Sequence, residues 1–504
     1  MGAAADGGRS VVLALDQGTT SSRTLLVDRT GRIAAVSQQA IGQTYPEPGW
    51  VEQDALAMWQ AQLATARQVL ADGTRGVADV AAIGISNQRE TTIVWERATG
   101  APVAPAIVWQ DRRTAGACAA LRAAGHEPLV TQRTGLVLDP YFSATKLRWI
   151  LEHVPDGVGR ARRGELAFGT VDSWLVWNLT GGRVHVTDAT NASRTLLYDI
   201  CTGVWDDELL ELFGVPRELL PAIVDTSGVV GETEPDLFGE PLPIAALCGD
   251  QQAALFGQGG HAAGQAKVTY GTGCFLLVHT GAAPVASRRG LLSTVASQRG
   301  ALRAYALEGS AFVGGAAVDW LRDSLGVISS AAQAIELAAR VEAGEGGVFV
   351  PALAGLGAPY WDPAARGAFC GLTLASTAAH LARAVLEGIA FQVADLVTAA
   401  SADAQLDLVE LRAGGGVSVS DVLLQFQADI LGVAVTRAAE KESTGLGAAC
   451  LAGLAVGLWS DEAEVEGLLR PGRRFEPDTA VDRDALLAGW RRAVTAVREF
   501  AVGV

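Results

Sequence analysis

The chain has 504 residues, which exceeds the size of a single ordinary core, so we expect two large domains. Hydrophobic residues make up 49% of the chain and charged residues 19%, a balance typical of a compact folded protein that excludes intrinsic disorder. The formal net charge of −16 argues against nucleic-acid binding, because a phosphate backbone requires a basic face.

Compartment and membrane signals are weak. The apolar run 11–15 is interrupted at once by Asp16, so it does not form the apolar core of a signal peptide. The six cysteines lack the spacing of a zinc site or a disulfide framework, and we expect reduced thiols in a cytoplasmic protein. The uncharged stretch 443–460 is rich in Gly and Ala and barely long enough to cross a bilayer. We interpret it as a buried helix and expect no membrane insertion.

The N-terminal third alternates between strand and helix patterns. Apolar runs at 11–15, 23–28 and 32–39 are separated by turn residues and predict three strands. Further on, residues 55–70 form an amphipathic helical pattern, residues 80–86 read as a strand, and residues 114–124 read as a helix. This alternation indicates α/β layers.

The opening pattern recurs in the middle of the chain. A predicted strand at 267–270 meets the turn Gly271-Thr272-Gly273, and a second strand follows at 274–280. Two such hairpins half a chain apart indicate an internal duplication. We place the boundary within residues 258–264, where glycines cluster, and predict domains at 10–257 and 264–500. Without a long linker, the domains should pack directly with a cleft between them.

A third signal lies late in the chain. Residues 406–411 read as a strand that Gly414, Gly415 and Gly416 break. An amphipathic helix is predicted from Ser420 to Leu431, with Ser420 as its N-cap. Glycines beside a helix start let backbone N–H groups approach a phosphate or nucleotide. The segment is therefore a candidate nucleotide contact.

The first turn, DQGTTSSR at residues 16–23, is a candidate phosphate-binding loop. An ordinary tight turn would explain the segment equally well if it stood alone. Its backbone N–H and hydroxyl groups can wrap phosphates, Asp16 can hold a hydrated Mg²⁺ ion, and Arg23 can neutralise phosphoryl charge. The second glycine turn at residues 271–273 supports the phosphate interpretation.

Four polar motifs stand beside apolar runs, and each has a simpler alternative. Arg89-Glu90 follows a strand-like run, where a solvated surface pair is the alternative. The motif around Trp109 could begin a helix with exposed charges, and the motif around Tyr141 could be a turn. Asp250 follows an apolar run, at the strand end where α/β sheets bind ligands, although a helix N-cap would explain it too.

In order along the chain, these segments resemble the FGGY family of carbohydrate kinases, and within it the branch that phosphorylates glycerol. The similarity runs from about Val11 to about Glu499. It rests on long collinear segments that include ALDQGTTSSR, PGWVEQD, ISNQRETTIVW, AIVWQDRRT, DPYFSATK, VHVTDATNASRT, GDQQAALFGQ, TYGTGCF, LEGSAFVGGA and PALAGLGAPYWDP. The resemblance implies two ribonuclease-H-like domains of the actin and hexokinase ATPase type, with ATP and glycerol meeting in the interdomain cleft.

The resemblance also implies a set of site residues. The positions that match glycerol-contacting residues are Arg89, Glu90, Tyr141, Asp250 and Gln251, with Trp109 and Phe275 as an apolar wall. Asp250 is the expected general base. Because the ordinary pKa of Asp is about 3.9, it cannot ionise a hydroxyl beforehand, so the proton should move late in phosphoryl transfer.

For the ATP and Mg²⁺ cofactors, the resemblance implies a second set. Asp16 matches the metal-associated position, and the nucleotide positions are Thr19, Thr20, Ser21, Arg23, Thr272, Gly315, Asp319, Gly416 and Ser420. Three positions depart from the family pattern, which usually has Asp where Gly414 stands, Gln where Asp319 stands and Asn where Ser420 stands. These departures predict altered nucleotide affinity or selectivity.

Three alternatives remain open on the sequence alone. The chain could phosphorylate another small polyol or sugar, or it could be a weakly active homologue that senses glycerol or nucleotide. A structural, actin-like filament role would leave the polyol-contacting residues without a purpose. Glycerol and ATP or ADP are the expected partners, and the family resemblance implies a homodimer or homotetramer.

Overall fold

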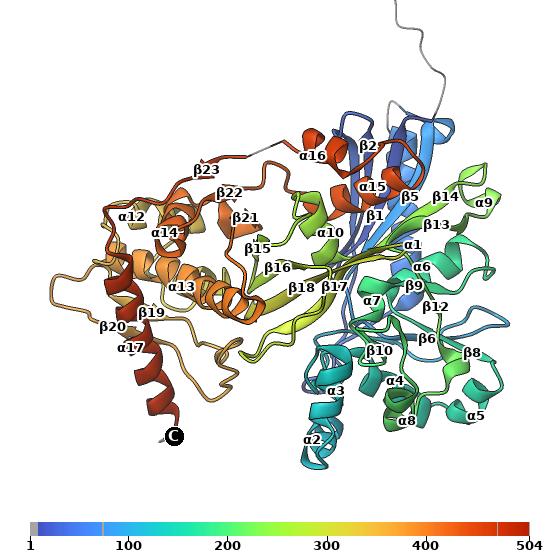
Figure 1. Ribbon diagram of the computed structural model, residues 1–504, viewed down its shortest axis with the longest axis horizontal. Coiled ribbons are helices and arrows are strands. Elements are labelled where there is room, and N and C mark those ends of the chain that lie inside the picture. The colour runs from blue at the N-terminus through green and yellow to red at the C-terminus, as the bar shows by residue number, and fades with distance from the viewer. Residues whose placement is uncertain (1–8, 73–74, 471, 503–504) are drawn as a thin grey trace, which may run out of the picture.

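The computed structural model describes residues 9–72, 75–470 and 472–502. The described chain forms two α/β units, each built around one large sheet (Figure 1). The first sheet contains, in spatial order, β13 (Ser227–Glu232), β14 (Pro243–Gly249), β5 (Val80–Asn87), β1 (Val11–Gln17), β2 (Ser21–Asp28) and β3 (Ile33–Ala40). The second contains β17 (Leu292–Arg299), β18 (Leu302–Ala311), β16 (Cys274–Gly281), β15 (Gln265–Tyr270), β21 (Glu410–Gly414), β22 (Val435–Arg437) and β23 (Arg474–Phe475).

The two sheets repeat one topology. In the first, the antiparallel hairpin β1–β2 is extended by antiparallel β3, while β5 and β14 run parallel to β1. In the second, the antiparallel hairpin β15–β16 is extended by antiparallel β18, while β21 and β22 run parallel to β15. The predicted internal duplication and the two ribonuclease-H-like units are therefore confirmed.

The remaining strands form short pairs, and helices cover the sheets. The pairs are β4 (Glu52–Gln53) with β7 (Ala106–Ile107), β6 (Ile93–Glu96) with β8 (Leu166–Gly169), β9 (Val186–Asp188) with β12 (Ala222–Val224), β10 (Tyr198–Asp199) with β11 (Val204–Trp205), and β19 (Val348–Val350) with β20 (Ala368–Cys370). The helices are α1 (Ala55–Asp72), α2 (Ala115–Ala123), α3 (Glu127–Thr134), α4 (Ser143–His153), α5 (Gly157–Arg162), α6 (Val171–Leu179), α7 (Ala189–Ala192), α8 (Asp207–Phe213), α9 (Pro235–Phe238), α10 (Asp250–Gly257), α11 (Ala316–Asp323), α12 (Ala331–Ala338), α13 (Ala378–Ala404), α14 (Asp421–Leu431), α15 (Ser443–Ala455), α16 (Glu462–Leu468) and α17 (Arg483–Val502).

Most of the uncharged stretch at 443–460 forms α15 (Ser443–Ala455), a buried helix as predicted, which packs on the first sheet and on α10. Glycine makes this close approach possible. A Cβ on Gly447 would lie 1.9 Å from the Ala253 carbonyl oxygen, and one on Gly257 would lie 2.2 Å from the Ser443 carbonyl oxygen. The C-terminal part of the chain thereby closes over the N-terminal sheet, next to the strands that carry the first hairpin.

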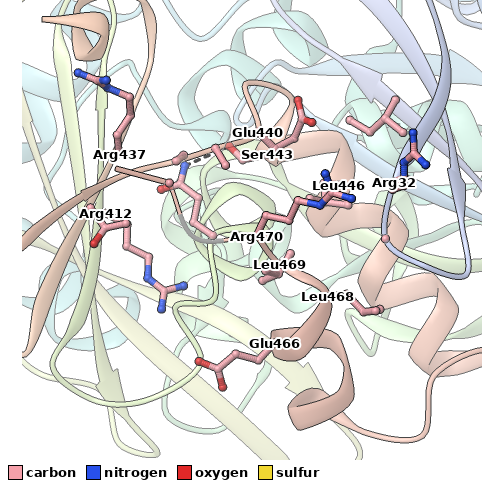
Figure 2. Close-up of a pocket in the computed structure, with 18 of the residues that line it drawn as sticks. Arg32, Arg412, Arg437, Glu440, Ser443, Leu446, Glu466, Leu468, Leu469 and Arg470 are labelled. Carbon is pink, nitrogen blue, oxygen red and sulfur yellow. Dashed lines mark hydrogen bonds between the residues drawn. The ribbon is translucent and has the colours of Figure 1, made fainter. Parts of the chain in front are cut away.

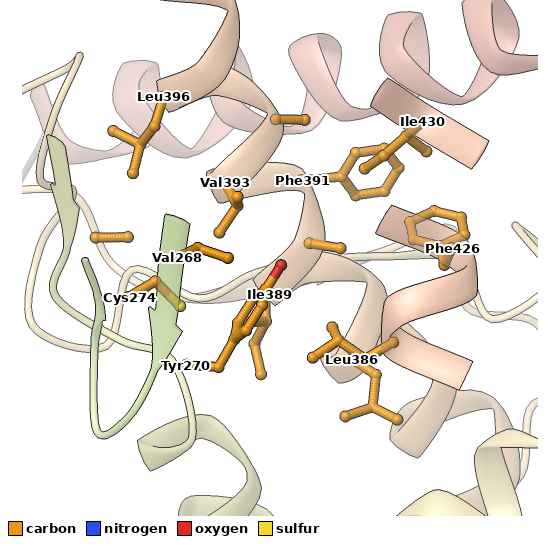
Figure 3. Packing of buried hydrophobic residues seen from close by; sticks show 14 of the residues in the cluster. Val268, Tyr270, Cys274, Leu386, Ile389, Phe391, Val393, Leu396, Phe426 and Ile430 are labelled. Carbon is orange, nitrogen blue, oxygen red and sulfur yellow. The ribbon is translucent and has the colours of Figure 1, made fainter. Parts of the chain in front are cut away.

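Burial of aromatic and aliphatic side chains fixes the second hairpin. Figure 3 shows Val268, Tyr270 and Cys274 of β15 and β16 facing Ile389 and neighbouring residues of α13. The Tyr270 hydroxyl, fully buried, donates a hydrogen bond to Gln427 Oε1 of α14 at 2.7 Å. This packing holds the glycine turn that follows Tyr270 in one place.

One strand boundary differs from its prediction. The strand predicted at 406–411 lies at Glu410–Gly414, so Gly414 is its last residue and does not break it. Thr269 of β15 pairs with Gly414 in register, and this long-range pairing sets the boundary. A local pattern carries no information about it.

By length and composition, α13 could cross a membrane, but 83% of its most apolar window is buried inside the protein. Such burial is typical of the core helix of a folded domain. Each of the six cysteines, all within the described part of the chain, is unpaired as expected. Four of them are buried, whereas Cys201 is exposed and Cys370 is half-buried.

Candidate active site

The predicted site residues of the first unit meet at one edge of its sheet. Strands β1, β5 and β14 run parallel, with Asp16 beside Ser86 and Gly249 beside Asn87. The next residues along the three strands therefore emerge together, at the carboxyl edge where α/β sheets bind ligands. Asp250 is among them, as the first residue of α10.

The first hairpin turn is shorter than predicted, because only residues 18–20 lie between β1 and β2. The Gly18 N–H donates to the Ser21 carbonyl oxygen at 2.9 Å, and Gln53 donates to the Thr19 carbonyl oxygen at 2.6 Å. Thr20 is exposed, and Thr19 and Ser21 are half-buried. The turn is thus held by a hydrogen bond from Gln53, and its hydroxyl-bearing residues remain accessible.

Asp16 lies half-buried at the end of β1, and its Oδ1 accepts a hydrogen bond from the Ser86 hydroxyl at 2.9 Å. Burial raises the pKa of Asp16 to about 6, and the nearby Asp250 charge adds to this, against the opposing effects of Ser86 and Arg23. A carboxylate that is poorly neutralised by its own protein is suited to a cation.

Arg23 has a partner that the sequence did not indicate. Its Nη1 contacts the carboxylate of Glu442, just before α15, while its buried Nε has no hydrogen-bond partner. A phosphate that binds Arg23 must therefore share this guanidinium with Glu442.

Asp250 is half-buried, with 30% of its side chain exposed. Its Oδ1 accepts a hydrogen bond from the Gln251 N–H at 2.7 Å and lies 3.3 Å from Arg89 Nε. Burial raises the pKa of Asp250, although Arg89 and Lys267 pull it down. Gly249 is required here, because a Cβ at this position would lie 2.7 Å from Arg89 Cδ.

Arg89 and Glu90 are buried, so their interpretation as a solvated surface pair is wrong. Their side chains are 3% and 1% exposed. Glu90 has a φ of 62°, a left-handed conformation that non-glycine residues rarely adopt and that is held here by the surrounding structure. Its side chain is thereby placed within the protein interior.

Two further charged residues complete a buried network around this pair. Glu308 of β18 contacts Arg89 through two pairs of atoms, and Arg194 bridges Glu308 and Glu90 at 2.9 and 2.6 Å. Two cations and two anions are paired, so the network is electrically balanced. Such pairing offsets part of the cost of removing four charges from water.

Lys267 of β15 is a third residue that was not predicted to belong to the site. It is fully buried, and its Nζ donates hydrogen bonds to Gln251 Oε1 and, at 3.1 Å, to the Thr269 hydroxyl. Burial lowers the pKa of Lys267 to about 7, against the opposing charge of Asp250. Two sequence features could have drawn attention to these residues. Arg194 and Glu308 lie in segments that carry the family resemblance, and Lys267 is one of few lysines in the chain. No local signal shows that these residues converge.

Aromatic residues form one wall of the site. The rings of Trp109 and Tyr141 meet edge to face, with centroids 5.6 Å apart. Trp109 Nε1 donates a hydrogen bond to the Thr19 hydroxyl at 3.0 Å, which ties this wall to the first hairpin turn. Phe275, which was predicted to form the wall together with Trp109, is half-buried on β16 opposite Ser310.

The predicted nucleotide positions of the second unit lie around two adjoining loops. The Gly315 N–H donates to the Gly271 carbonyl oxygen at 2.7 Å, and the carbonyl oxygen of the exposed Thr272 accepts from Gly314 at 2.7 Å. A Cβ on Gly315 would lie 2.8 Å from Val417 Cγ2, whereas a Cβ on Gly416 would meet nothing within 4 Å. The start of α11 therefore lies against Val417, which directly follows the glycine loop of residues 414–416.

Two departures from the family pattern have different surroundings. Asp319 is exposed on α11, where it pairs with Arg322 at 3.0 Å. Ser420 is fully buried, and its hydroxyl caps α14 by accepting from the Leu423 N–H at 3.2 Å. The N-cap prediction is confirmed. The structure gives Ser420 a role in the helix and does not place its side chain on an open surface.

A cavity of about 640 Å³ lies elsewhere, between the β2–β3 turn of the first unit and β21 and β22 of the second (Figure 2). Several arginines surround it, but Arg412 pairs with Glu410 at 3.2 Å and Arg437 pairs with Asp421 at 2.5 Å. Among the described residues that line it, none is a predicted site residue. The cavity is therefore separate from the candidate active site.

Comparison with known proteins identifies relatives of similar length. The chain is 58% identical to a glycerol kinase from Dechloromonas aromatica over 485 residues, which covers 96% of each protein. Its fold matches the crystal structure of Plasmodium falciparum glycerol kinase with ADP, with a TM-score of 0.93, 34% identity and coverage of 97% and 98%. A xylulose kinase from Rhodospirillum rubrum matches with a TM-score of 0.87, 27% identity and coverage of 97% and 99%.

Two family models cover most of the chain. The model of the N-terminal domain of the FGGY carbohydrate kinases matches residues 11–257, and that of the C-terminal domain matches residues 266–456. The matched ranges contain the first hairpin with Asp250 and the second hairpin with the glycine loop, respectively. The chain belongs to the FGGY family of carbohydrate kinases.

Proposed function

We propose that this chain is an ATP-dependent kinase that phosphorylates glycerol to sn-glycerol 3-phosphate. The observation that carries the proposal is the near-full-length identity of 58% to a glycerol kinase, against 27% to a pentulose kinase of the same fold. The charge of the buried network is consistent with this substrate, because a balanced set of charges suits a neutral polyol.

Glycerol would bind with its hydroxyl groups against Arg89, Glu90, Tyr141, Asp250 and Gln251, and with its carbon chain against Trp109 and Phe275. Arg89 is the best supported of these contacts, since its guanidinium lies beside both Asp250 and Tyr141. Buried polar groups of this kind reject analogues that leave them unpaired. The site would thereby favour a three-carbon polyol.

Asp250 would act as the general base. Its carboxylate is half-buried, and the Arg89 and Lys267 charges favour its ionised form against the effect of burial. The hydroxyl proton passes to Asp250 as the hydroxyl oxygen bonds to the γ-phosphorus of ATP and the bond to the β,γ-bridging oxygen breaks. ADP leaves with that bridging oxygen.

Magnesium fits the residues at the end of β1. Mg²⁺ is usually held by one or two carboxylates together with substrate phosphates, and the half-buried Asp16 supplies such a carboxylate beside the first hairpin turn. When bound, the ion would neutralise charge on the ATP phosphates. No group of three or more potential metal ligands is found in the described part of the chain.

ATP would lie between the two hairpins, with Thr19, Thr20, Ser21 and Arg23 on one side and Thr272, Gly315, Asp319 and Gly416 on the other. The two domains are proposed at 10–257 and 264–500, and closure of the cleft between them would exclude water from the phosphoryl group. We further propose a cytoplasmic enzyme that assembles as a homodimer or homotetramer.

A coupled assay of ADP release with glycerol, ATP and Mg²⁺ tests the proposal. We expect a kcat/KM for glycerol well above those for xylulose, gluconate and erythritol. A higher value for any of these compounds would make the chain a kinase of that substrate. Glycerol binding without turnover, in a calorimetric titration of the same sample, would instead indicate a sensing homologue.

A further inference from the structure

We propose that Glu308 is a positioning residue for the bound polyol. It would act through Arg89, by fixing the edge of the guanidinium group that faces Asp250 and Tyr141. The proposal rests on the function proposed above and adds to it a residue that comes from the other unit of the protein.

Glu308 accepts hydrogen bonds from both terminal nitrogens of the Arg89 guanidinium. Its Oε2 accepts from Arg89 Nη1 at 2.5 Å, and its Oε1 accepts from Arg89 Nη2 at 3.1 Å. Two parallel hydrogen bonds of this kind fix the plane of a guanidinium as well as its position. Both side chains are at least 97% buried, so water does not compete for these contacts.

The opposite edge of Arg89 has only weak partners. Its Nε lies 3.3 Å from Asp250 Oδ1 without forming a hydrogen bond, and its Nη2 reaches the Tyr141 hydroxyl at 3.4 Å. Contacts of this length are poor hydrogen bonds. The N–H groups on the edge formed by Nε and Nη2 are therefore the ones left for a ligand hydroxyl, and Glu308 determines that this edge faces the base.

Glu308 is itself held in place. Arg194 Nη2 donates to its Oε1 at 2.9 Å. Although burial opposes ionisation, the charges of Arg194 and Arg89 lower the pKa of Glu308 to about 2. The Glu308 carboxylate stays ionised throughout the physiological pH range. Its hydrogen bonds with Arg89 therefore do not depend on pH in that range.

The ion pair between Glu308 and Arg89 also joins the two units. Arg89 and Arg194 lie in the part matched by the N-terminal family model, and Glu308 lies on β18, in the part matched by the C-terminal model. The orientation of a substrate-binding side chain in the first unit therefore depends on where the second unit places its sheet. A change in the relative placement of the two units would therefore change the orientation of Arg89 at the polyol site, even when no ligand bridges the units.

A double-mutant cycle tests the proposal, using Glu308→Gln, Arg89→Ala and the pair. We expect Glu308→Gln to raise the KM for glycerol about ten-fold or more, as for loss of a charged hydrogen bond, with the KM for ATP changed by less than about two-fold. In the Arg89→Ala background, Glu308→Gln should have no further effect on the KM for glycerol, because its effect passes through Arg89. Calorimetric titration of glycerol provides the same comparison without turnover.

Glu387→Gln is the matched control. Glu387 is a buried carboxylate of α13 that pairs with Arg383 at 2.6 Å. The Glu387→Gln variant should leave the KM for glycerol unchanged. If Glu308→Gln does not fold, Glu308→Asp keeps the charge, shortens the reach, and should raise the KM for glycerol selectively.

Two results would overturn the inference. One is a folded Glu308 variant whose KM and dissociation constant for glycerol equal those of the wild type. The other is a cycle in which the effects of Glu308→Gln and Arg89→Ala simply multiply. Failure of the proposed function is seen separately, since it would appear as a wild-type preference for another polyol, and the same cycle would then be measured with that polyol.

Discussion

The polyol side and the nucleotide side of the proposed site are built differently. On the polyol side, Arg89, Glu90 and Glu308 are nearly inaccessible and are held by charged hydrogen bonds. On the nucleotide side, Thr272 and Gly416 are exposed, and the Asp319 side chain is 57% exposed. One side is a rigid, desolvated network, and the other consists of loops and a helix start open to water.

The difference predicts where the protein is sensitive to mutation. Removing one member of a buried charged network leaves its partner unpaired, which is costly. An exposed charge interacts through water and contributes little. Substitutions on the polyol side should therefore alter catalysis and glycerol binding strongly, while those at exposed positions of the nucleotide side, such as Asp319, should shift ATP affinity only slightly.

The largest effect is expected for Asp250→Asn, which keeps the shape of the side chain but removes the proposed base. Turnover should fall about 10²–10⁴-fold, a common loss when a general base is removed. The coupled assay measures it, with circular dichroism as the check on folding. Asp225→Asn, a change at a carboxylate outside the site, is the control. Near-normal turnover in folded Asp250→Asn would exclude Asp250 as the base.

Asp16→Asn should lower Mg²⁺-dependent turnover about 100-fold or more, because the metal would lose its carboxylate. The same substitution should not lower the thermal stability of the protein at neutral pH. The pKa of Asp16 is raised to about 6, so its favourable contribution is complete below pH 3.8 and is lost as the pH rises through 6. At pH 7.5 without ligands, Asp16→Asn should therefore melt no lower than the wild type.

Thermal melts at pH 5 and pH 7.5 check this sign. At pH 5 the Asp16 carboxyl group takes up a proton. The thermal midpoint of the wild type should therefore rise relative to that of Asp16→Asn. A variant that melts lower at pH 7.5 and loses no turnover would assign Asp16 a structural role and would remove it from the metal site.

A smaller effect is expected for Lys267→Met, which removes the donor to Gln251. The KM for glycerol should rise about two- to ten-fold, as for loss of one ordinary hydrogen bond. Because the pKa of Lys267 is about 7, its positive charge is lost as the pH rises through that value. The KM of the wild type for glycerol should therefore rise between pH 6 and 8, toward that of the variant, whereas the KM of the variant should stay constant. The exposed Lys441→Met is the control, and equal pH profiles would show that Lys267 does not act on the site.

The smallest effect is expected for Asp319→Gln on the nucleotide side. Removing an exposed negative charge near the nucleotide should lower the KM for ATP by about two- to three-fold, within the range of exposed charge interactions. Ser420→Ala should lower the thermal midpoint through loss of the helix cap, without changing the ratio of activities with ATP and GTP. A ten-fold change from Asp319→Gln would show that the nucleotide side is as closely built as the polyol side.

Local pattern alone specified much of this protein. The apolar runs of β1 and β5, the presence of glycine turns after β1 and at residues 271–273, and the capped helix α14 all follow from residue type and periodicity. The repeat of the hairpin is enough to indicate a duplicated α/β fold. Each of these features depends on neighbours within a few residues, which a sequence displays directly.

Only the tertiary structure decided how the site is held together. Arg89 meets Glu308 across 219 residues of chain, and Lys267 meets Gln251 because β15 passes beside the start of α10. The exposed or buried state of Arg89-Glu90, left open by the sequence, was settled in the same way. Pairing of this kind depends on how two sheets pack, and the free energy that places a charge in the interior comes from partners that local sequence cannot name.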